Sequence, residues 1–327
     1  MAEGLLDELG DGWLRDQVLG LRTFTAVLAG ESMSLAYEAA GSYGVRPEHT
    51  EESKFVAAHE RLERVLIGSG PLPEKYRRWE EAMKVPSDKL EQTLVRAIET
   101  ARRLTRRIVD LPEGEEVAVD TARDVRWMAF CKYLGNLKSR VSVNVDRPLS
   151  AVELLTVATH EAYPGHHTEH SCKEQLLVRE RSMVEETIRL SPTPQSLISE
   201  GIGRMASARL LDSVDGSDLE AVVRDAGVDF DLAHAREVQR AYEVCSGAIV
   251  NAALELDERT LSQEGAAEYL QRWALVAPEI ATRLIQYLVD PTSRTYVFTY
   301  LAGQELCESY VGDDPARFSN LLTCQRT

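Results

Sequence analysis

Residues 160–170, HEAYPGHHTEH, hold four of the chain's seven histidines and two glutamates within eleven residues. Histidine is the commonest metal ligand among protein side chains, and a glutamate beside it can act as a general base. Histidines at this density next to a glutamate are rarely structural. The run therefore predicts a metal site, and the proline inside it restricts how the chain can fold around that site.

The position of Pro164 decides which histidines can meet. In the common H-E-x-x-H pattern the second histidine follows the first by four residues and shares its helical face. Here that place is taken by Pro164, so the partner of His160 must be His166 or His167. A regular helix, at ~100° per residue, would turn His166 away and place His167 ~10 Å along the axis. Pro164 and Gly165 therefore predict a local break that brings two histidines together.

Several ligand pairs remain open within this run. We expect His160 to pair with His166, with two inserted residues bulging out of the helix. The rival is His166 with His170, an ordinary four-residue pair if a new helix begins with Pro164 in its first turn. His167 is a further alternate ligand. Competing interpretations are solvated or core histidines beside a helix break, and a purely structural zinc site, which usually draws on thiolates.

A third ligand is expected from Glu200, forty residues after His160. It lies on an apolar-patterned segment that reads as a helix starting near residues 191–194. A carboxylate on such a buried face needs a positive partner, and a metal dication would supply it unless Glu200 points outward or pairs with Arg204. Two histidines and one glutamate leave a fourth position open for a water molecule. The metal would lower the pKa of that water to ~7, and Glu161 would take its proton.

Amide cleavage also needs a donor for the oxyanion of the tetrahedral intermediate. We expect it from Tyr300 or Arg294. Tyr296 would share a helical face with Tyr300 and contact the substrate, although aromatic residues at this spacing are more often core. Asn144 ends an alternating, strand-like run, and an edge strand beside the metal helix could hold an extended substrate. A strand-ending turn is an equally good interpretation of Asn144.

Two segments carry a resemblance to a known family: residues 139–144, SRVSVN, and residues 154–167, LLTVATHEAYPGHH. They are similar to the core of the bacterial proteins catalogued as domain of unknown function 885. The resemblance continues at residues 199–201, SEG, which is similar to the family's E-G-W segment. It continues more weakly over residues 290–303, and in all it covers about residues 125–311.

The resemblance implies a helical, zinc-dependent peptidase, thermolysin-like in its metal motif and distantly similar to carboxypeptidase Taq. It implies that Glu200 is the third metal ligand and that Tyr300 corresponds to the family's tyrosine. Four positions around the site depart from the family pattern: Glu169, His170, Ile202 and Arg294. These departures bear on the choice of metal and of substrate.

Charge and cysteine content narrow the function classes. A net charge of −16 argues against binding to nucleic acid or to anionic membranes, both of which require a basic surface. The five cysteines are scattered without C-x-x-C spacing, which argues against a disulfide framework. The N-terminus is acidic and lacks the features of a signal peptide, and no window reaches the ~20 apolar residues of a membrane span. We therefore expect a cytoplasmic protein with a small peptide or peptide-like substrate.

The periodicity predicts a mainly α fold with a small antiparallel β-sheet next to the metal-binding helix. Strands are expected near residues 117–119, 127–133 and 140–145, with a hairpin turn at Gly135–Asn136. We expect residues 1–112 to form a helical N-terminal part and residues 113–327 the catalytic, metal-binding part, together one compact domain. Helices are expected within these ranges: 1–42, 51–68, 74–109, 232–256 and 274–288.

The sequence therefore predicts a zinc-dependent hydrolase with one zinc ion per chain, a peptidase or amidase acting on short peptides or peptide-like small molecules. One alternative is a biosynthetic enzyme that uses the same helix pair with iron or another divalent metal, because two histidines and a carboxylate also hold redox iron. A second alternative is a metal-stabilised binding protein without catalysis.

Overall fold

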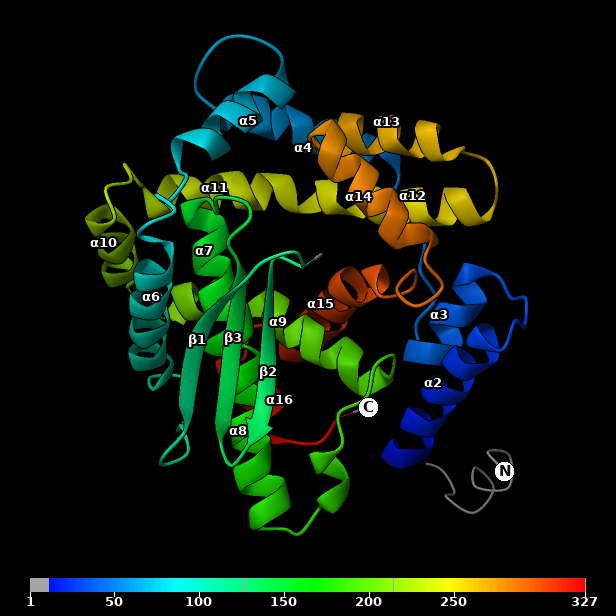
Figure 1. Ribbon diagram of the computed structural model, residues 1–327, viewed down its shortest axis with the longest axis vertical. Helices are drawn as coiled ribbons and strands as arrows, with labels where there is room; N and C mark the ends of the chain where they lie inside the picture. The colour runs from blue at the N-terminus through cyan, green and yellow to red at the C-terminus, as the bar shows by residue number, and fades with distance from the viewer. Residues whose placement is uncertain (1–11, 126, 214, 327) are drawn as a thin grey trace.

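The computed structural model describes residues 12–125, 127–213 and 215–326. Over these residues the chain is mainly helical, and its strands form one three-stranded sheet (Figure 1). The predicted fold class, mainly α with a small sheet, is confirmed. In Figure 1 the sheet stands to the left of centre, helices α4, α5 and α11–α14 gather across the top, and α2 and α3 lie at the right.

The sheet consists of β1 (Glu116–Ala122), β2 (Ala129–Gly135) and β3 (Lys138–Asn144). Strands β2 and β3 form the predicted antiparallel hairpin. Its two turn residues, Asn136 and Leu137, both have positive φ, as a type I′ turn requires, so the turn lies one residue later than predicted. Strand β1 runs parallel to β3, which makes the sheet mixed rather than wholly antiparallel. Strand β3 lies between β1 and β2, so it pairs with one parallel and one antiparallel neighbour.

One face of the sheet covers the segment that carries the histidines. On β3 the side chains of Ser139, Val141 and Val143 are buried, whereas Lys138 and Arg140 point to solvent. This alternation is the period-two pattern of a half-buried strand. The inward face packs on α8 and on the turn before it, so the sheet forms one wall beside the candidate metal ligands.

Helices enclose the other sides of this segment. Those before the sheet are α2 (Trp13–Leu28), α3 (Leu35–Tyr43), α4 (Glu52–Val65), α5 (Leu72–Ala82) and α6 (Leu90–Thr105). The α-helices after it are α7 (Ala151–Val157), α8 (His166–Lys173), α9 (Pro194–Ser213), α10 (Ser217–Asp225), α11 (Leu232–Tyr242), α12 (Gly247–Asp257), α13 (Gln263–Trp273), α14 (Pro278–Val289), α15 (Val297–Val311) and α16 (Pro315–Thr323). Shorter π or 3-10 turns are η1 (Ala158–Ala162), η2 (Glu174–Arg179), η3 (Val184–Thr187) and η4 (Glu243–Ser246).

The predicted helical ranges correspond closely to these elements, with three interruptions; residues 1–11 of the first range lie outside the described residues. The rest of that range divides between α2 and α3, and the range 74–109 divides between α5 and α6. The range 232–256 is not one continuous helix, because the 3-10 turn η4 separates α11 from α12. Among the described residues, no helix combines the length and the apolar character needed to cross a membrane.

Hydrophobic clusters join residues on both sides of position 112. One cluster packs Leu94 of α6 against Val141 of β3 and Leu154 of α7. Another packs Phe55 of α4 against Leu197 of α9 and other C-terminal residues. Helix α9 lies at the centre, where it crosses α15 and contacts η1. The two parts expected from the sequence therefore share their cores.

Candidate metal centre

A π-helical turn followed by a break brings the histidines together. Helix α7 begins with a capping box between Ser150 and Glu153, and it runs into η1, which carries His160 and Glu161. Such π turns widen a helix locally and are frequent at functional sites. The chain then turns, and α8 begins at His166. The break lies where Pro164 and Gly165 predict it, but the new helix begins after both residues rather than with Pro164 in its first turn.

Glycine is required at the bend. A Cβ atom on Gly165 would lie 1.9 Å from the carbonyl oxygen of His160, a distance no side chain tolerates. The backbone of the bend therefore lies directly against η1. This contact reverses the chain within a few residues and allows His160 and His166 to face the same space, which a continuous helix would prevent.

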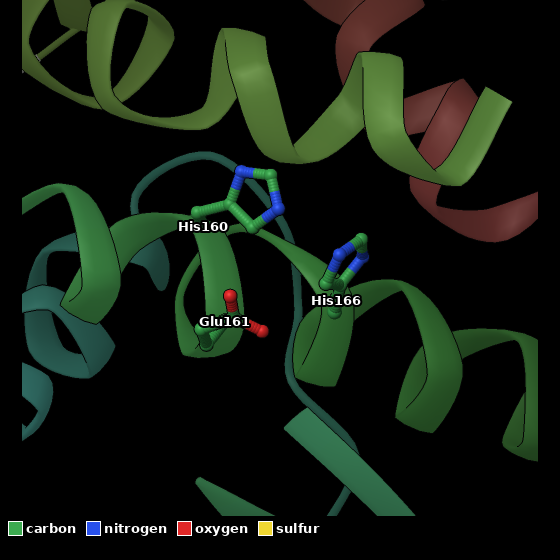
Figure 2. Close-up of side chains that lie close together, drawn as sticks. All are labelled: His160, Glu161 and His166. Carbon is green, nitrogen blue, oxygen red and sulfur yellow. The ribbon is translucent and has the colours of Figure 1, made fainter. Parts of the chain in front are cut away.

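The structure brings together three of the predicted site residues, His160, Glu161 and His166. One nitrogen or oxygen from each lies within 4.8 Å of the others. The two imidazole rings are nearly perpendicular, with centroids 4.6 Å apart. Figure 2 shows both rings beneath a neighbouring helix, with the Glu161 carboxylate below them. Of the ligand pairs that the sequence leaves open, His160 with His166 is the one whose nitrogens converge.

Helix α9 supplies the fourth member of the site. Oε2 of Glu200 lies 3.3 Å from Nε2 of His160, and Oε1 lies 3.5 Å from Nε2 of His166. Helix α9 can lie this close because Gly203 faces the His160 ring: a Cβ atom there would lie 2.6 Å from Cε1. Tyr296, at the N-cap of α15, donates a hydrogen bond to Glu200 Oε1 at 2.5 Å.

The electrostatics between these side chains favour a cation. Burial would raise the pKa of Glu200, but the imidazoles of His160 and His166 hold it well below the usual range. Burial would lower the pKa of His166, but the Glu200 carboxylate raises it to about 9. Both shifts arise because the carboxylate and the imidazoles, hydrogen-bonded at close range, stabilise each other's charged forms. Oε2 of Glu200 is buried and accepts no hydrogen bond from any described residue.

The outer side of His166 is held by a chain of hydrogen bonds. The Ser199 hydroxyl donates to Glu169 Oε2 at 2.6 Å, and Nδ1 of His166 lies 3.1 Å from the same hydroxyl oxygen. Glu169 is buried and also accepts from Lys173 at 2.7 Å. This pattern assigns the ring proton of His166 to Nδ1, which leaves Nε2 free for a metal ion. Glu169 therefore holds this candidate metal ligand in position through Ser199.

The donor set fits a divalent metal ion. Nε2 of His160, Nε2 of His166 and Oε2 of Glu200 are the nitrogen and oxygen ligands that zinc uses in catalytic sites. Glu161 is half-buried, and no hydrogen bond or ion pair engages its carboxylate in the part of the chain that the structure describes. Glu161 is therefore free to ligate the metal or to accept a proton beside it.

His167, an alternate ligand in the sequence-based prediction, points away from this space. Its ring is fully buried, with Nε2 donating to Glu115 at 2.9 Å and Nδ1 accepting from Ser139 at 2.7 Å. Burial lowers the pKa of His167, in agreement with a neutral ring. The Glu115 carboxylate also accepts from Tyr163 and, at 2.6 Å, from Arg102. These contacts form what we call the Glu115 network.

The Glu115 network holds both ends of the turn that leads to His166, a candidate metal ligand. Tyr163 precedes the Pro-Gly bend and His167 follows His166, yet both donate to one carboxylate. Glu115 itself precedes β1 and is buried. Sequence reasoning missed Glu115, because it lies about fifty residues before the histidines and no local spacing links them.

His170, the other alternate ligand, also lies outside the group formed by His160, Glu161 and His166. Its ring stacks on that of His166 with centroids 6.0 Å apart, but its Nδ1 accepts a hydrogen bond from Arg189 Nε at 2.9 Å. Burial and the positive charge of Arg189 hold the pKa of His170 well below its usual range. The His170 and Tyr133 rings pack edge to face, with their centroids 5.4 Å apart. His170 therefore connects the metal centre to Arg189 and the sheet.

The tyrosines predicted from α15 line the same region. Tyr300 packs edge to face on Tyr296, with centroids 5.6 Å apart, and 37% of its surface is exposed. Two more tyrosines, Tyr43 and Tyr287, belong to this region. Burial chiefly raises the pKa of each, and the Glu200 charge raises both further. They come from α3 and α14, and no sequence spacing relates them to the histidines.

Arg294 and Asn144 are engaged elsewhere. Nε of Arg294 donates to Glu38 at 2.8 Å, and Arg294 also lies 3.9 Å from Asp257, so its charge is compensated away from the histidines. Asn144 donates through its amide to two carbonyls of the β1–β2 loop at 3.1 and 3.2 Å. Its side-chain oxygen accepts from the backbone of Asp146 at 2.9 Å. The strand-ending turn is the interpretation of Asn144 that these contacts match.

Comparisons with known proteins show a likeness in fold only. No protein-family model and no curated protein matches this chain. Among solved structures, the chain is similar to the crystal structure of a "putative lipoprotein" from Colwellia psychrerythraea, with a TM-score of 0.63 and 15% sequence identity. The match covers 88% of this chain and 52% of the other, so this chain spans about half of that neighbour's length.

Proposed function

We propose that this protein is a zinc-dependent hydrolase, a peptidase or amidase acting on short peptides or peptide-like small molecules. The observation that carries the proposal is the convergence of His160 Nε2, His166 Nε2 and Glu200 Oε2, the last of these buried without a hydrogen bond from the described residues. Glu161 lies within 4.8 Å of the histidine nitrogens with no competing partner in the described chain. The resemblance to the family of unknown function 885 is consistent with the same site.

Two carboxylates compete for the third ligand position, and we assign it to Glu200. Its oxygens lie 3.3 and 3.5 Å from the histidine nitrogens, and its burial makes an uncompensated charge costly. Tyr296 fixes the carboxylate by binding Oε1, so that Oε2 faces His160 without a hydrogen-bond donor among the described residues. Glu161, more exposed and unpartnered, is then the general base.

In the proposed reaction, a bound zinc ion would polarise the scissile carbonyl and lower the pKa of a water molecule to about 7. Glu161 would accept a proton from that water and later return it to the leaving amine. Tyr300, partly exposed beside Tyr296, would donate a hydrogen bond to the developing oxyanion. Arg294 has no part in this scheme, because Glu38 and Asp257 hold it.

A second candidate follows from the same donor set. Two histidines and one carboxylate also form the facial triad of non-haem iron enzymes, so a biosynthetic enzyme using iron is the alternative. Metal content separates the two candidates. Elemental analysis of protein purified without a metal-affinity tag should find about one zinc per chain, lost in His160→Ala. Stoichiometric iron would favour the alternative, and no bound metal would refute the site.

Catalysis is tested by replacing Glu161 with Gln. A hydrolase should keep its metal and lose turnover by a factor of about 10² or more, because the general base is removed while the ligands stay. Peptide and amide libraries supply the substrates. Unchanged turnover in Glu161→Gln would refute the role of Glu161. A metal-stabilised binding protein would show no turnover in either form.

A further inference from the structure

A single arginine lies beside the candidate metal centre. Arg189 follows η3, and its Nε donates to His170 Nδ1 at 2.9 Å. The guanidinium also lies over the ring of Tyr133, 4.5 Å from the ring centroid. His170 in turn stacks on His166. A positive charge is therefore fixed one aromatic ring away from a proposed metal ligand.

Arg189 forms no ion pair with a carboxylate anywhere in the described ranges, although the chain has 53 acidic and 37 basic residues. The acidic side chain bound to Tyr133 is Glu174, and it is already satisfied: it accepts from the Tyr133 hydroxyl at 2.6 Å and from Arg179. By contrast, Arg102 and Arg294 each bind a buried glutamate. A guanidinium has five N–H donors, so Arg189 keeps donors beyond those that His170 accepts.

The arginine and the turn that carries the proposed general base both contact the same strand, because Arg189 lies over Tyr133 and η1 packs on β2. Burial raises the pKa of the Cys131 thiol to about 12; the Glu161 charge contributes to this rise, and Arg189 opposes it. Both charges therefore act on one side chain of the inward face of β2. Glu161, His170 and Arg189 are all partly exposed.

We propose that Arg189 binds a carboxylate of the substrate, so that this protein acts on molecules with an anionic group within a few residues of the scissile bond. The proposal rests on the hydrolase function proposed above. An arginine fork binds a carboxylate with two parallel hydrogen bonds and so fixes its orientation. His170 and Tyr133 hold the guanidinium rigidly, which reduces the entropy lost on binding. The carboxylate could be the free end of a peptide or an acidic side chain.

The experiment measures binding separately from turnover. Zinc-loaded Glu161→Gln protein is titrated calorimetrically with three probes: acetyl-Ala-Ala-Phe with a free carboxylate, its C-terminal amide, and acetyl-Ala-Asp-Phe amide. The same titrations are made after adding Arg189→Met or Arg189→Lys. Arg103→Met is the matched control, because Arg103 is exposed and pairs with Asp218 at 2.8 Å. Zinc content and melting temperature identify any variant that fails to fold.

We expect the free-carboxylate peptide to bind about tenfold or more tightly than its amide, and Arg189→Met to abolish this difference. Arg189→Lys should retain part of it, because the charge remains while the fork is lost. Arg103→Met should change nothing. If the aspartate peptide binds as tightly as the free-carboxylate peptide, the site accepts acidic side chains; weak binding of the aspartate peptide restricts it to chain ends.

Three results would overturn the proposal: neither carboxylate probe binds more tightly than the amide, Arg189→Met weakens the carboxylate probes and the amide equally, or neither carboxylate probe binds. Equal loss would mean that Arg189 only supports His170. Hydrolysis of the same peptides by protein that retains Glu161 is scored separately. Hydrolysis that does not depend on Arg189 would support the hydrolase function and refute the carboxylate site at Arg189. Binding that depends on Arg189, without hydrolysis, would support the carboxylate site and refute the hydrolase function.

Discussion

Tyr296 and Glu200, ninety-six residues apart in the chain, form a hydrogen bond of 2.5 Å that occupies Oε1 of the carboxylate and leaves Oε2 to face His160. The hydroxyl satisfies Oε1, and Oε2 remains without a donor among the described residues. A carboxylate held in this way presents one oxygen to a metal ion, because rotation would break the bond to Tyr296. In the proposed site, Tyr296 would therefore position Glu200, and its expected contact with the substrate stays a prediction.

Tyr296→Phe should weaken zinc binding by about tenfold, within the range that partners of metal ligands contribute. The reason is that Glu200 loses the donor that orients it. Competition with a chromophoric chelator measures this change. Tyr300→Phe is the matched control: it should keep zinc affinity and lower kcat, because the proposed role of Tyr300 is in the reaction. Equal zinc affinity in both variants would argue against the orienting role of Tyr296.

Glu115→Gln should weaken zinc binding by about 10–100-fold, although Glu115 touches no ligand. Its carboxylate holds both ends of the turn that carries His166, and the amide cannot accept from Tyr163, His167 and Arg102 together. The visible spectrum of the cobalt-substituted protein reports the ligand geometry and should change as well.

The control for that variant is Glu38→Gln. Glu38 is also buried and pairs with an arginine, Arg294, and among the described residues it forms no hydrogen bond or ion pair with the histidines or Glu200. Both variants should lose about 3–5 kcal/mol of unfolding free energy, as expected for breaking a buried ion pair. Only Glu115→Gln should alter the cobalt spectrum. An altered spectrum in Glu38→Gln would show that the effect is a general consequence of destabilisation.

Gly203→Ala should reduce zinc content, because its Cβ atom would lie 2.6 Å from the His160 ring and displace it. Elemental analysis after gel filtration measures the loss. Gly265→Ala in α13 is the control: its Cβ atom would meet its nearest neighbour at an ordinary 3.5 Å. That variant should keep its zinc and gain roughly 0.5–1 kcal/mol from better helix propensity. Full zinc content in Gly203→Ala would contradict the close packing of α9 on η1.

Glu80 should make stability depend on pH. Burial, with help from the charge of Glu153, raises its pKa from 4.5 to about 7. The folded state therefore holds a proton that the unfolded state has already lost, so stability falls as pH rises from about 4.5 to about 7. Glu80→Gln should gain about 1–2 kcal/mol at pH 8 and nothing near pH 4. Urea denaturation at the two pH values checks this, and an equal gain at both would contradict it.

Local signals in the sequence explain what could be predicted here. The break between His160 and His166 follows from the covalent geometry of Pro164 and Gly165, and the sheet follows from alternation along each strand. Contacts between distant segments carry no such signal. The parallel pairing of β1 with β3 depends on how the chain returns after β1, and Arg294 is bound by Glu38, 256 residues away. Neither the β1–β3 pairing nor the Glu38–Arg294 ion pair could be predicted from charge and spacing alone.

The place of β3 in the middle of the sheet determines the order in which this part of the protein can form. Strands β1 and β2 are made first but do not pair with each other, so neither has a partner until residues 138–144 have been synthesised. The β2–β3 hairpin closes a loop of two residues and can form early, whereas β1 must close a longer loop to reach β3. Ser139 of β3 binds His167. The last strand to be synthesised is therefore the one that joins the sheet to the turn carrying the candidate metal ligands.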